Sequence, residues 1–166
     1  RCTGNEEYVD CGCPGLRSLQ DYIEYKKIAM NSVEPGWMNH GYSPAKGDDI
    51  WKHQRALYME VSRGIPSGSR LLEVGCGRGA GLSALTEAHN LSAAVGLDII
   101  ECHVSFARRR YPQLEFVQGS AENLPFPSAA FDVILTIEAS HLFPSIVNFL
   151  HEAARLLKPG GTLLYA

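Results

Sequence analysis

Residues 71–81 combine an apolar run, an acid and a glycine-rich turn in the order Leu-Leu-Glu-Val-Gly-Cys-Gly-Arg-Gly-Ala-Gly. Such a segment lets a buried parallel strand pass into a helix while leaving the main chain open to a ligand. The acid, Glu73, stands just before the first glycine and favours a ligand that carries positive charge. This stretch limits the chain to folds in which a strand, a turn and a helix together form a ligand site.

Short apolar segments alternate with helical patterns from residue 70 onward. The spacing predicts strands at 70–74, 93–98, 115–118, 131–137 and 162–166, and helices at 80–89, 101–111 and 145–157. Lys158-Pro159-Gly160-Gly161 is interpreted as the turn before the last strand. This alternation is typical of an α/β fold whose mostly parallel sheet carries helices on both faces. Ligands of such sheets lie beyond the carboxyl ends of the strands.

The first 64 residues have a different pattern and are interpreted as an arm and helical lid (1–64) before a ligand-binding core (65–166). Helical spacing covers about 16–31, a loop follows, and a second helix runs from Asp48 or Asp49 to about Ser62. Cys2, Cys11 and Cys13 lie in the arm as free thiols or, alternatively, as a redox or metal group.

Composition excludes several classes of protein. The 166 residues are 45% hydrophobic and 20% charged, which is typical of one globular domain and argues against disorder. A formal charge of −3 provides no electrostatic footprint for nucleic acid. No apolar segment approaches a membrane span, no secretory signal is visible, and the 5 cysteines suit a reducing compartment. We therefore expect a cytoplasmic protein without a membrane span, a nucleic-acid partner or a metal site.

Two cofactors compete for the glycine turn. Gly75-x-Gly77-x-x-Ala80 satisfies the loose dinucleotide pattern, and Asp98 follows about 20 residues later, where an acid would bind a ribose. A dinucleotide would place its pyrophosphate against the turn, where Glu73 repels it. S-adenosylmethionine instead carries a sulfonium and an ammonium, which Glu73 attracts. Asp98 can accept hydrogen bonds from both ribose hydroxyls, cap the following helix, or do both.

Several motifs together resemble class I S-adenosylmethionine-dependent methyltransferases. They are Glu73-Val74-Gly75-Cys76-Gly77-Arg78-Gly79, Gly96-Leu97-Asp98, Gly119-Ser120-Ala121-Glu122-Asn123-Leu124-Pro125-Phe126, Phe131-Asp132-Val133 and Leu157-Lys158-Pro159-Gly160-Gly161. They stand in that family's order and cover about residues 70–166. The resemblance implies a Rossmann-like methyltransferase fold with S-adenosylmethionine as its cofactor.

The same resemblance implies roles for individual residues. The cofactor-binding set would be Glu73, Gly75 and Gly77 at the methionine portion, Asp98 at the ribose, Ile99, Ser120 and Ala121 at the adenine, and Ile137 beside the methionine moiety. Relatives often carry an aspartate where this chain has Ser120. A hydroxyl still accepts a hydrogen bond from the adenine amine, but it is shorter and uncharged.

Two further segments resemble small-molecule and lipid methyltransferases, nearest to the phthiotriolone dimycocerosate type that methylates oxygen, with sterol and natural-product enzymes as wider relatives. They are Met38-Asn39-His40-Gly41-Tyr42 and Glu138-Ala139-Ser140-His141. In such proteins the N-terminal helices form a lid over the cofactor. Tyr42 would then direct its hydroxyl to the methionine end, or serve as an aromatic anchor that packs on the core.

Methyl transfer to a hydroxyl needs alignment of the acceptor and removal of one proton. His141 is the candidate base because it follows the fourth strand on the ligand side and imidazole titrates near neutral pH. Glu138 would orient it or take the proton itself. In the alternative interpretation His141 only packs or caps the next helix.

The fifth predicted strand, 162–166, ends the chain, whereas the family continues into two more strands. An uncovered strand edge favours association, so we expect a fragment, a truncated product, or a partner or oligomer at this edge. The leading hypothesis is an S-adenosylmethionine-dependent methyltransferase acting on a small-molecule or lipid acceptor. A non-catalytic cofactor-binding or interaction module and a nicotinamide-dependent oxidoreductase are the alternatives.

Overall fold

The computed structural model describes residues 36–42 and 50–166. Strands β1 (Arg70–Val74), β2 (Ala93–Asp98), β3 (Glu115–Gln118), β4 (Phe131–Thr136) and β5 (Leu157–Tyr165) form one sheet in the order β3-β2-β1-β4-β5. Every neighbouring pair is parallel. The helices are α2 (Ile50–Val61), α3 (Ala80–Ala88), α4 (Glu101–Arg110) and α5 (Ile146–Leu156), with a short 3₁₀ turn η1 (Ser140–Leu142) after β4. This architecture confirms the predicted Rossmann-like α/β fold.

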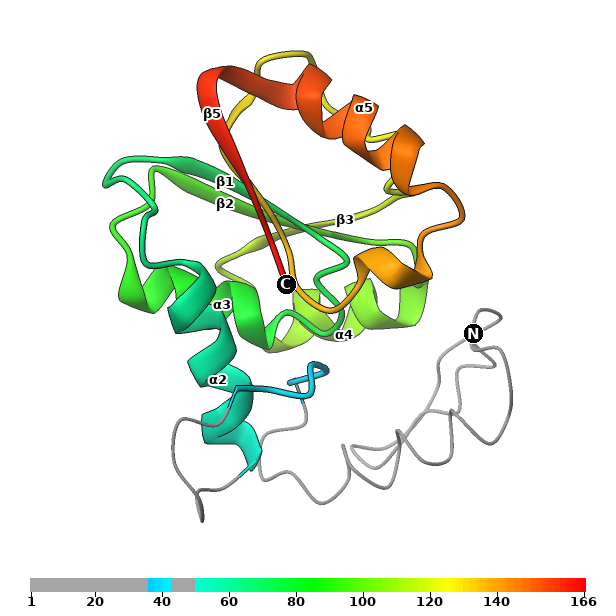
Figure 1. The fold of residues 1–166 in the computed structure, drawn as a ribbon. Coiled ribbons are helices and arrows are strands. Elements are labelled where there is room, and N and C mark those ends of the chain that lie inside the picture. The colour runs from blue at the N-terminus through cyan, green and yellow to red at the C-terminus, as the bar shows by residue number, and fades with distance from the viewer. Residues whose placement is uncertain (1–35, 43–49) are drawn as a thin grey trace.

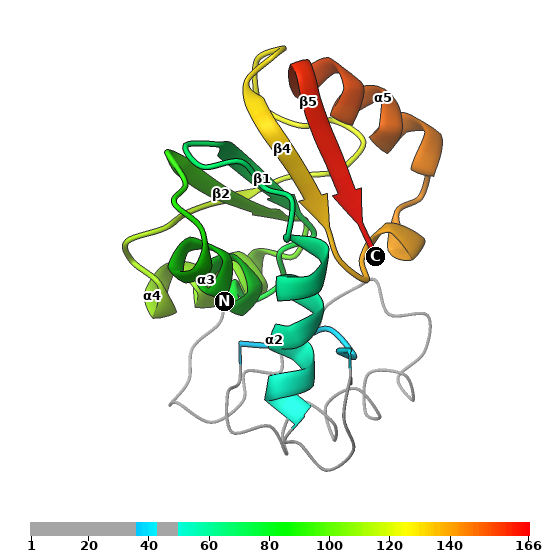
Figure 2. The same cartoon turned by 60° about the vertical axis from the view of Figure 1, so that its left-hand side comes forward.

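Helices cover both faces of the sheet. Figures 1 and 2 show α3 and α4 on one face, with α2 beside α3, and α5 on the other. Successive residues of a strand point to opposite faces, so Leu71 joins the core beneath α2, α3 and α4 while Leu72 joins the core beneath α5. Both leucines are fully buried, and β1 lies at the centre of the sheet. The continuous apolar run in the sequence reflects this burial on two sides.

The strand order reverses between β1 and β4, which are direct neighbours although two other strands separate them in the chain. Glu73 of β1 stands opposite Leu135 of β4 on one side and Gly96 of β2 on the other. The turn after β1 and the segment after β4 therefore flank the same crevice at the carboxyl edge of the sheet. Ligands of doubly wound sheets bind at this point of reversal.

The predicted strands at 70–74, 93–98 and 115–118 are confirmed at both ends. The predicted start of the last strand is wrong, because β5 begins at Leu157 and includes the segment interpreted as a turn. Leu157 pairs with Phe131, whereas Thr162 pairs with Val133. Between these two pairs β5 therefore contains more residues than β4. Gly160 has a φ of +80° and absorbs the extra length as a local irregularity within the strand.

An Arg–Glu pair on α5 fixes the loop that follows β3. Arg155 donates to the carbonyl oxygens of Phe126 (2.8 Å) and Leu124 (2.9 Å), and Glu152 accepts from the main-chain N–H of Leu124 (2.7 Å). Arg155 and Glu152 also pair with each other at 2.6 Å. The loop that carries Ser120 is therefore tied to α5 by side chains rather than by regular secondary structure.

The predicted helix at 16–31 and the cysteines of the arm lie outside the described residues. None of the helices described here is long and apolar enough to cross a bilayer. The division of the chain at residues 64 and 65 stays a prediction. The described segment 36–42 nevertheless packs into the same core as the sheet, because Trp37 and Tyr58 of α2 belong to the core beneath α2, α3 and α4.

Candidate functional site

The turn after β1 is built from residues in the left-handed region of backbone space. Gly75, Gly77 and Gly79 have φ values of +77°, +54° and +85°. Glycine adopts this region without the steric cost that a Cβ would impose. The N–H groups of Gly75 and Cys76 both donate to the carbonyl oxygen of Leu97, at 2.7 and 3.0 Å. The turn is thereby held against the end of β2.

Protein groups pack directly on these glycines. A Cβ on Gly75 would lie 2.5 Å from Cβ of Ala139, and one on Gly79 would lie 2.7 Å from the Phe116 ring. A Cβ on Gly77 would lie 2.5 Å from Sδ of Met38. The segment after β4 and the segment 36–42 therefore both approach the turn closely. The sequence predicted a turn whose main chain is open to a ligand, and the structure adds that side chains of the protein pack against this turn.

Glu73 is completely buried beside the turn, with no exposed surface. Its Oε1 accepts a 2.7 Å hydrogen bond from the hydroxyl of Tyr58 on α2, while Oε2 is buried without a hydrogen-bond partner among the described residues. Burial raises the pKa of the Glu73 carboxyl to about 8; the hydrogen bond from Tyr58 opposes this shift and the negative charge of Asp98 adds to it. The site therefore holds an acid that a bound cation would help to ionise.

Asp98 ends β2 and connects the two neighbouring loops. Its Oδ2 accepts from the N–H of Gly77 at 2.8 Å, and its Oδ1 accepts from the N–H of Ile100 at 2.9 Å. Nδ1 of His103, in the first turn of α4, lies 3.4 Å from Oδ1 without forming a hydrogen bond. Sequence reasoning missed His103, although its place in the first turn after Asp98 was a usable signal. The main-chain contact to Ile100 matches the capping role considered for Asp98, and each oxygen keeps a second lone pair.

The residues predicted to surround the adenine come to the same edge of the sheet. Asp98 is paired with Gln118 in the strand register, so the loops after β2 and β3 begin side by side. Ile99 is 62% exposed, whereas Ala121 is buried in the core beneath α5. The hydroxyl of Ser120 accepts from the N–H of Glu122 at 3.2 Å, which leaves its own proton available for another acceptor.

The segment after β4 contacts the lid segment. Ile137 is buried, and Glu138 has a φ of +50°, an uncommon conformation for a residue with a side chain. Oε2 of Glu138 accepts a hydrogen bond from the main-chain N–H of His40. His141 lies in η1 with its side chain exposed. In this part of the chain Glu138 therefore contacts His40, and no hydrogen bond joins it to His141.

The segment 36–42 is anchored along α2. The side-chain amide of Asn39 donates to the main-chain carbonyl oxygen of Gln54 at 2.9 Å. The side-chain amide of Gln54 donates in return to the main-chain carbonyl oxygen of Asn39 at 2.6 Å. The N–H of Tyr42 donates to the carbonyl oxygen of His53 at 2.8 Å. These contacts hold Met38 over Gly77 from a position far away in the sequence.

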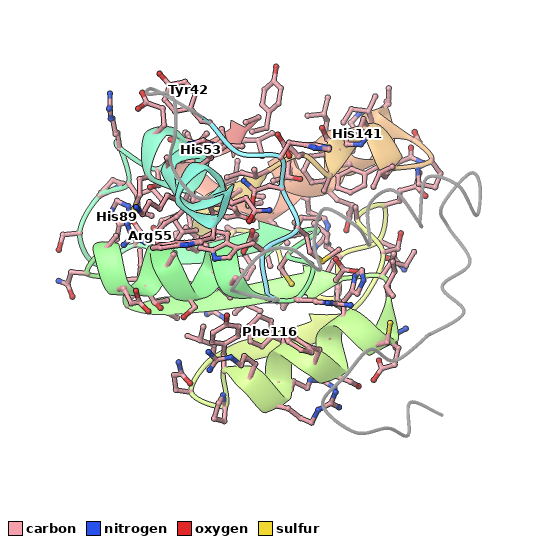
Figure 3. All side chains as sticks on the ribbon, turned by 90° about the horizontal axis from the view of Figure 1, so that it is seen from below. Tyr42, His53, Arg55, His89, Phe116 and His141 are labelled. Atoms are coloured by element: carbon pink, nitrogen blue, oxygen red, sulfur yellow. The ribbon has the colours of Figure 1, made fainter. Side chains whose placement is uncertain are left out.

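Tyr42 and His141 lie apart at this edge of the molecule. Figure 3 shows Tyr42 near α2 and His141 well separated from it, on the other side of the view. Tyr42 is 45% exposed and lines a cavity of about 520 Å³ along α2, together with Trp51, Lys52, Arg55, Ala56, Met59, Glu60 and Arg63. A second cavity of about 250 Å³ lies at the amino ends of β1 and β4. Neither of these two cavities is lined by a residue of the glycine turn.

The acidic side chains at the turn suit a cationic ligand better than a pyrophosphate. Two buried carboxylates, Glu73 and Asp98, border the turn, and an oxygen of Glu73 lacks a partner in the described structure. A phosphate group would face the negative charge of Asp98 and oppose ionisation of Glu73, whereas an ammonium or sulfonium would be attracted to Asp98 and would favour the ionised form of Glu73. In the described ranges, no group of three or more His, Cys, Asp or Glu side chains is arranged to hold a metal ion.

Comparison with known proteins identifies a family over the same part of the chain. A family model described as a methyltransferase domain matches residues 72–165. A phthiotriol/phenolphthiotriol dimycocerosates methyltransferase of Mycobacterium ulcerans is 45% identical over 68% of this chain and 41% of its own length. A fatty-acid O-methyltransferase of Mycolicibacterium smegmatis is 39% identical over 78% of this chain and 51% of its own length. The chain thus spans about half the length of the curated relatives it matches.

Solved structures with similar folds include proteins of different activity. The 4+2 cyclase SpnF superimposes with a TM-score of 0.75 at 25% identity, over 87% of this chain and 57% of that one. A putative sarcosine dimethylglycine methyltransferase from Galdieria sulphuraria has a TM-score of 0.74 at 18% identity, over 88% and 58% of the two chains. These matches confirm the predicted fold and the predicted resemblance, and with it S-adenosylmethionine as the cofactor.

Proposed function

The chain belongs to the methyltransferase-domain family, and from this we propose that it binds S-adenosylmethionine at the glycine turn and that the whole protein methylates a small-molecule or lipid acceptor. The observation that carries the proposal is the pair of buried carboxylates, Glu73 and Asp98, beside a turn of left-handed glycines at the reversal of strand order. Two acids at this place favour a cationic cofactor over a phosphorylated one.

The positions of the residues support the binding roles that the family resemblance implies. Glu73 would face the positively charged methionine portion, which needs the close main-chain approach that Gly75 and Gly77 allow. Asp98 would accept from the ribose hydroxyls with its remaining lone pairs. Exposed Ile99 would lie against the adenine, with Ser120 and Ala121 at its rim and Ile137 near the methionine moiety.

The acceptor is proposed to be a hydroxyl or carboxyl oxygen of a lipid or another small molecule. The names of the two relatives support this class, since they describe methyltransferases of dimycocerosates and of fatty acids. When bound, the cofactor supplies an activated methyl group. The protein must then align the acceptor oxygen, exclude water and, for a hydroxyl, receive one proton.

His141 is the proposed proton acceptor. Its exposed imidazole on η1 stands on the ligand side of the sheet and would take the proton from the acceptor hydroxyl as the oxygen–methyl bond forms. Glu138 is the alternative base, because its carboxylate lies in the same segment, although it accepts from the N–H of His40. A carboxylate acceptor, already ionised, would need neither residue as a base.

Calorimetry with S-adenosylmethionine, its demethylated product and NAD tests the cofactor. Binding of either sulfur compound without binding of NAD supports the proposal, and the reverse pattern would refute it. A labelled methyl group followed into a panel of fatty acids and hydroxylated lipids then tests the activity and identifies the acceptor class.

A non-catalytic cofactor-binding module is the second candidate. The similarity to the cyclase SpnF carries it, because this fold is compatible with roles other than methyl transfer. Tight cofactor binding without methyl transfer to any member of the panel would favour this candidate. The cytoplasmic location and a partner or oligomer at the β5 edge stay predictions.

A further inference from the structure

A hydrogen bond connects α2 to the acid of the glycine turn. The hydroxyl of Tyr58 donates to Oε1 of Glu73 at 2.7 Å, and both side chains are buried. The two residues are 15 positions apart and belong to different elements, α2 and β1. Nothing in the binding roles assigned above uses Tyr58.

The ring of Tyr58 has little freedom to move. It lies so close to the Cα of Gly81 on α3 that any Cβ at that position would overlap the ring. On another side it forms an edge-to-face contact with Trp37, with ring centroids 5.5 Å apart and an interplanar angle of 66°. Gly81 and Trp37 therefore fix where the hydroxyl points, and Trp37 links that position to the segment 36–42.

The two oxygens of Glu73 thereby have different tasks. Oε1 is occupied by Tyr58, whereas Oε2 has no hydrogen-bond partner in the described structure. We infer that Tyr58 is a positioning residue, which holds the Glu73 carboxyl so that Oε2 is presented to the cation of the cofactor and favours the ionised acid that this contact requires. This inference rests on the proposed cofactor binding and adds to it a role for α2.

The surrounding groups give the contact a pH dependence. Cys76 of the turn, Asp98 of β2 and Glu138 after β4 are the other titratable groups acting on the pair, and all three are acids, with His103 beyond Asp98. Burial raises the pKa of Glu73 to about 8, and the Tyr58 hydrogen bond works in the opposite direction. Cofactor binding should therefore release a proton from Glu73 to the buffer near neutral pH, and affinity should rise as pH approaches 8.

The variant Tyr58→Phe removes the hydroxyl and keeps the ring that packs on Gly81 and Trp37. Its matched control is Tyr111→Phe, which removes another buried tyrosine hydroxyl, at the C-cap of α4, that does not hydrogen-bond to Glu73 and does not shift its pKa. The dissociation constant of S-adenosylmethionine is measured by calorimetry from pH 5.5 to pH 9 in buffers of different ionisation enthalpy, which also counts the protons released. Urea unfolding of the cofactor-free proteins over the same pH range reports the protonation of Glu73 independently of cofactor binding.

We expect Tyr58→Phe to move the midpoint of the affinity profile upward by about one pH unit, which weakens binding at pH 7 by roughly tenfold. The pH range in which the cofactor-free protein loses stability should move upward with it, and Tyr111→Phe should leave both profiles in place. Unchanged midpoints in Tyr58→Phe, or equal shifts in both variants, would overturn the inference while leaving the proposed function intact. If the unmodified protein does not bind S-adenosylmethionine at all, the proposed function fails first and the inference with it.

Discussion

Gly77 donates its main-chain N–H to Oδ2 of Asp98 over 2.8 Å, across 21 positions of sequence. The contact joins two motifs that the sequence presents separately, the glycine turn after β1 and the acid that ends β2. Because the parallel strands β1 and β2 are direct neighbours, their carboxyl ends meet at one edge. Asp98 thus shapes the turn in addition to offering its lone pairs to a ligand.

Replacing Asp98 with asparagine tests its contact to the glycine turn and its proposed contact to the ribose of the cofactor. Loss of the charge should weaken cofactor binding by about 1.5–3 kcal/mol, or roughly ten- to a hundredfold. Asp132→Asn is the matched control, since Asp132 also accepts a main-chain N–H, that of Arg70 at 2.8 Å, but from the amino end of its strand. Calorimetry measures both affinities, and equal affinities for Asp98→Asn and the unmodified protein would remove Asp98 from the ribose site.

The raised pKa of Glu73 predicts how stability depends on pH. The folded protein holds a proton on Glu73 up to about pH 8, whereas an unfolded glutamate loses it near pH 4.3. The contribution of Glu73 to the free energy of unfolding is therefore fully present below about pH 4 and is lost as pH rises to about 8. Over this range the free energy of unfolding falls by up to about 1.4 kcal/mol per pH unit. Glu73→Gln should flatten this slope in urea unfolding between pH 5 and pH 8.

Other groups with shifted pKa values affect stability at pH values outside the range assigned to Glu73. The pKa values of Asp132 and Glu152 are lowered, Asp132 mainly by the main-chain N–H of Arg70 and Glu152 mainly by Arg155, so their contributions are lost in acid. The pKa values of Tyr58 and Cys76 are raised by burial and matter in alkali. A slope unchanged by Glu73→Gln between pH 5 and pH 8 would contradict the assignment to Glu73.

Gly79 should tolerate no side chain. Its φ is +85°, and a Cβ would lie 2.7 Å from the ring of Phe116, a residue of β3 that is buried in the core beneath α2, α3 and α4. Gly79→Ala is expected to lower the free energy of unfolding by about 1–3 kcal/mol, because strained backbone and overlap add together. Gly64→Ala is the control: a Cβ there meets no atom within 4 Å, so its effect should stay within about 0.5 kcal/mol.

His141→Ala tests the proposed base. If the acceptor is a hydroxyl, turnover should fall by about 10²–10⁴-fold, with unchanged cofactor affinity and unchanged stability, because the side chain is exposed. His151→Ala on α5 is the control, since His151 is equally an exposed histidine but belongs to a helix away from the turn. Full turnover in His141→Ala, measured with a hydroxylated acceptor, would place the base elsewhere.

Arg155→Lys tests how the loop after β3 is held. Lysine cannot reproduce the two forked contacts to the carbonyl oxygens of Leu124 and Phe126, so the free energy of unfolding should fall by about 1–2 kcal/mol. Arg63→Lys alters an exposed pair with Glu60 and should change little. Thermal unfolding compares the two variants, and equal melting temperatures would mean that the loop after β3 is stabilised by other contacts.

Local sequence signals located β1, β2 and β3 correctly because their apolar runs end at acids, glycines or polar residues within a few positions. The same reasoning misplaced the start of β5, since Pro159 and the two glycines indicate a turn. Pairing of Leu157 with Phe131 extends the strand across that irregularity. Hydrogen bonding to a neighbouring strand overrode local preference there, as it does wherever tertiary contacts stabilise an unfavourable segment.

By itself the sequence determined the α/β class, the glycine turn and the two acids that border it, because strand period, glycine conformation and charge are local properties. Only the tertiary structure decided which groups those residues meet. Tyr58 reaches Glu73, Met38 covers Gly77, and His40 contacts Glu138. Each contact joins segments far apart in the chain, and burial beneath α2 rather than residue type raises the pKa of Glu73. The glycine turn can be predicted from the spacing of its residues. The pKa of the acid beside it depends instead on tertiary packing, in which α2 and the segment 36–42 lie against the turn.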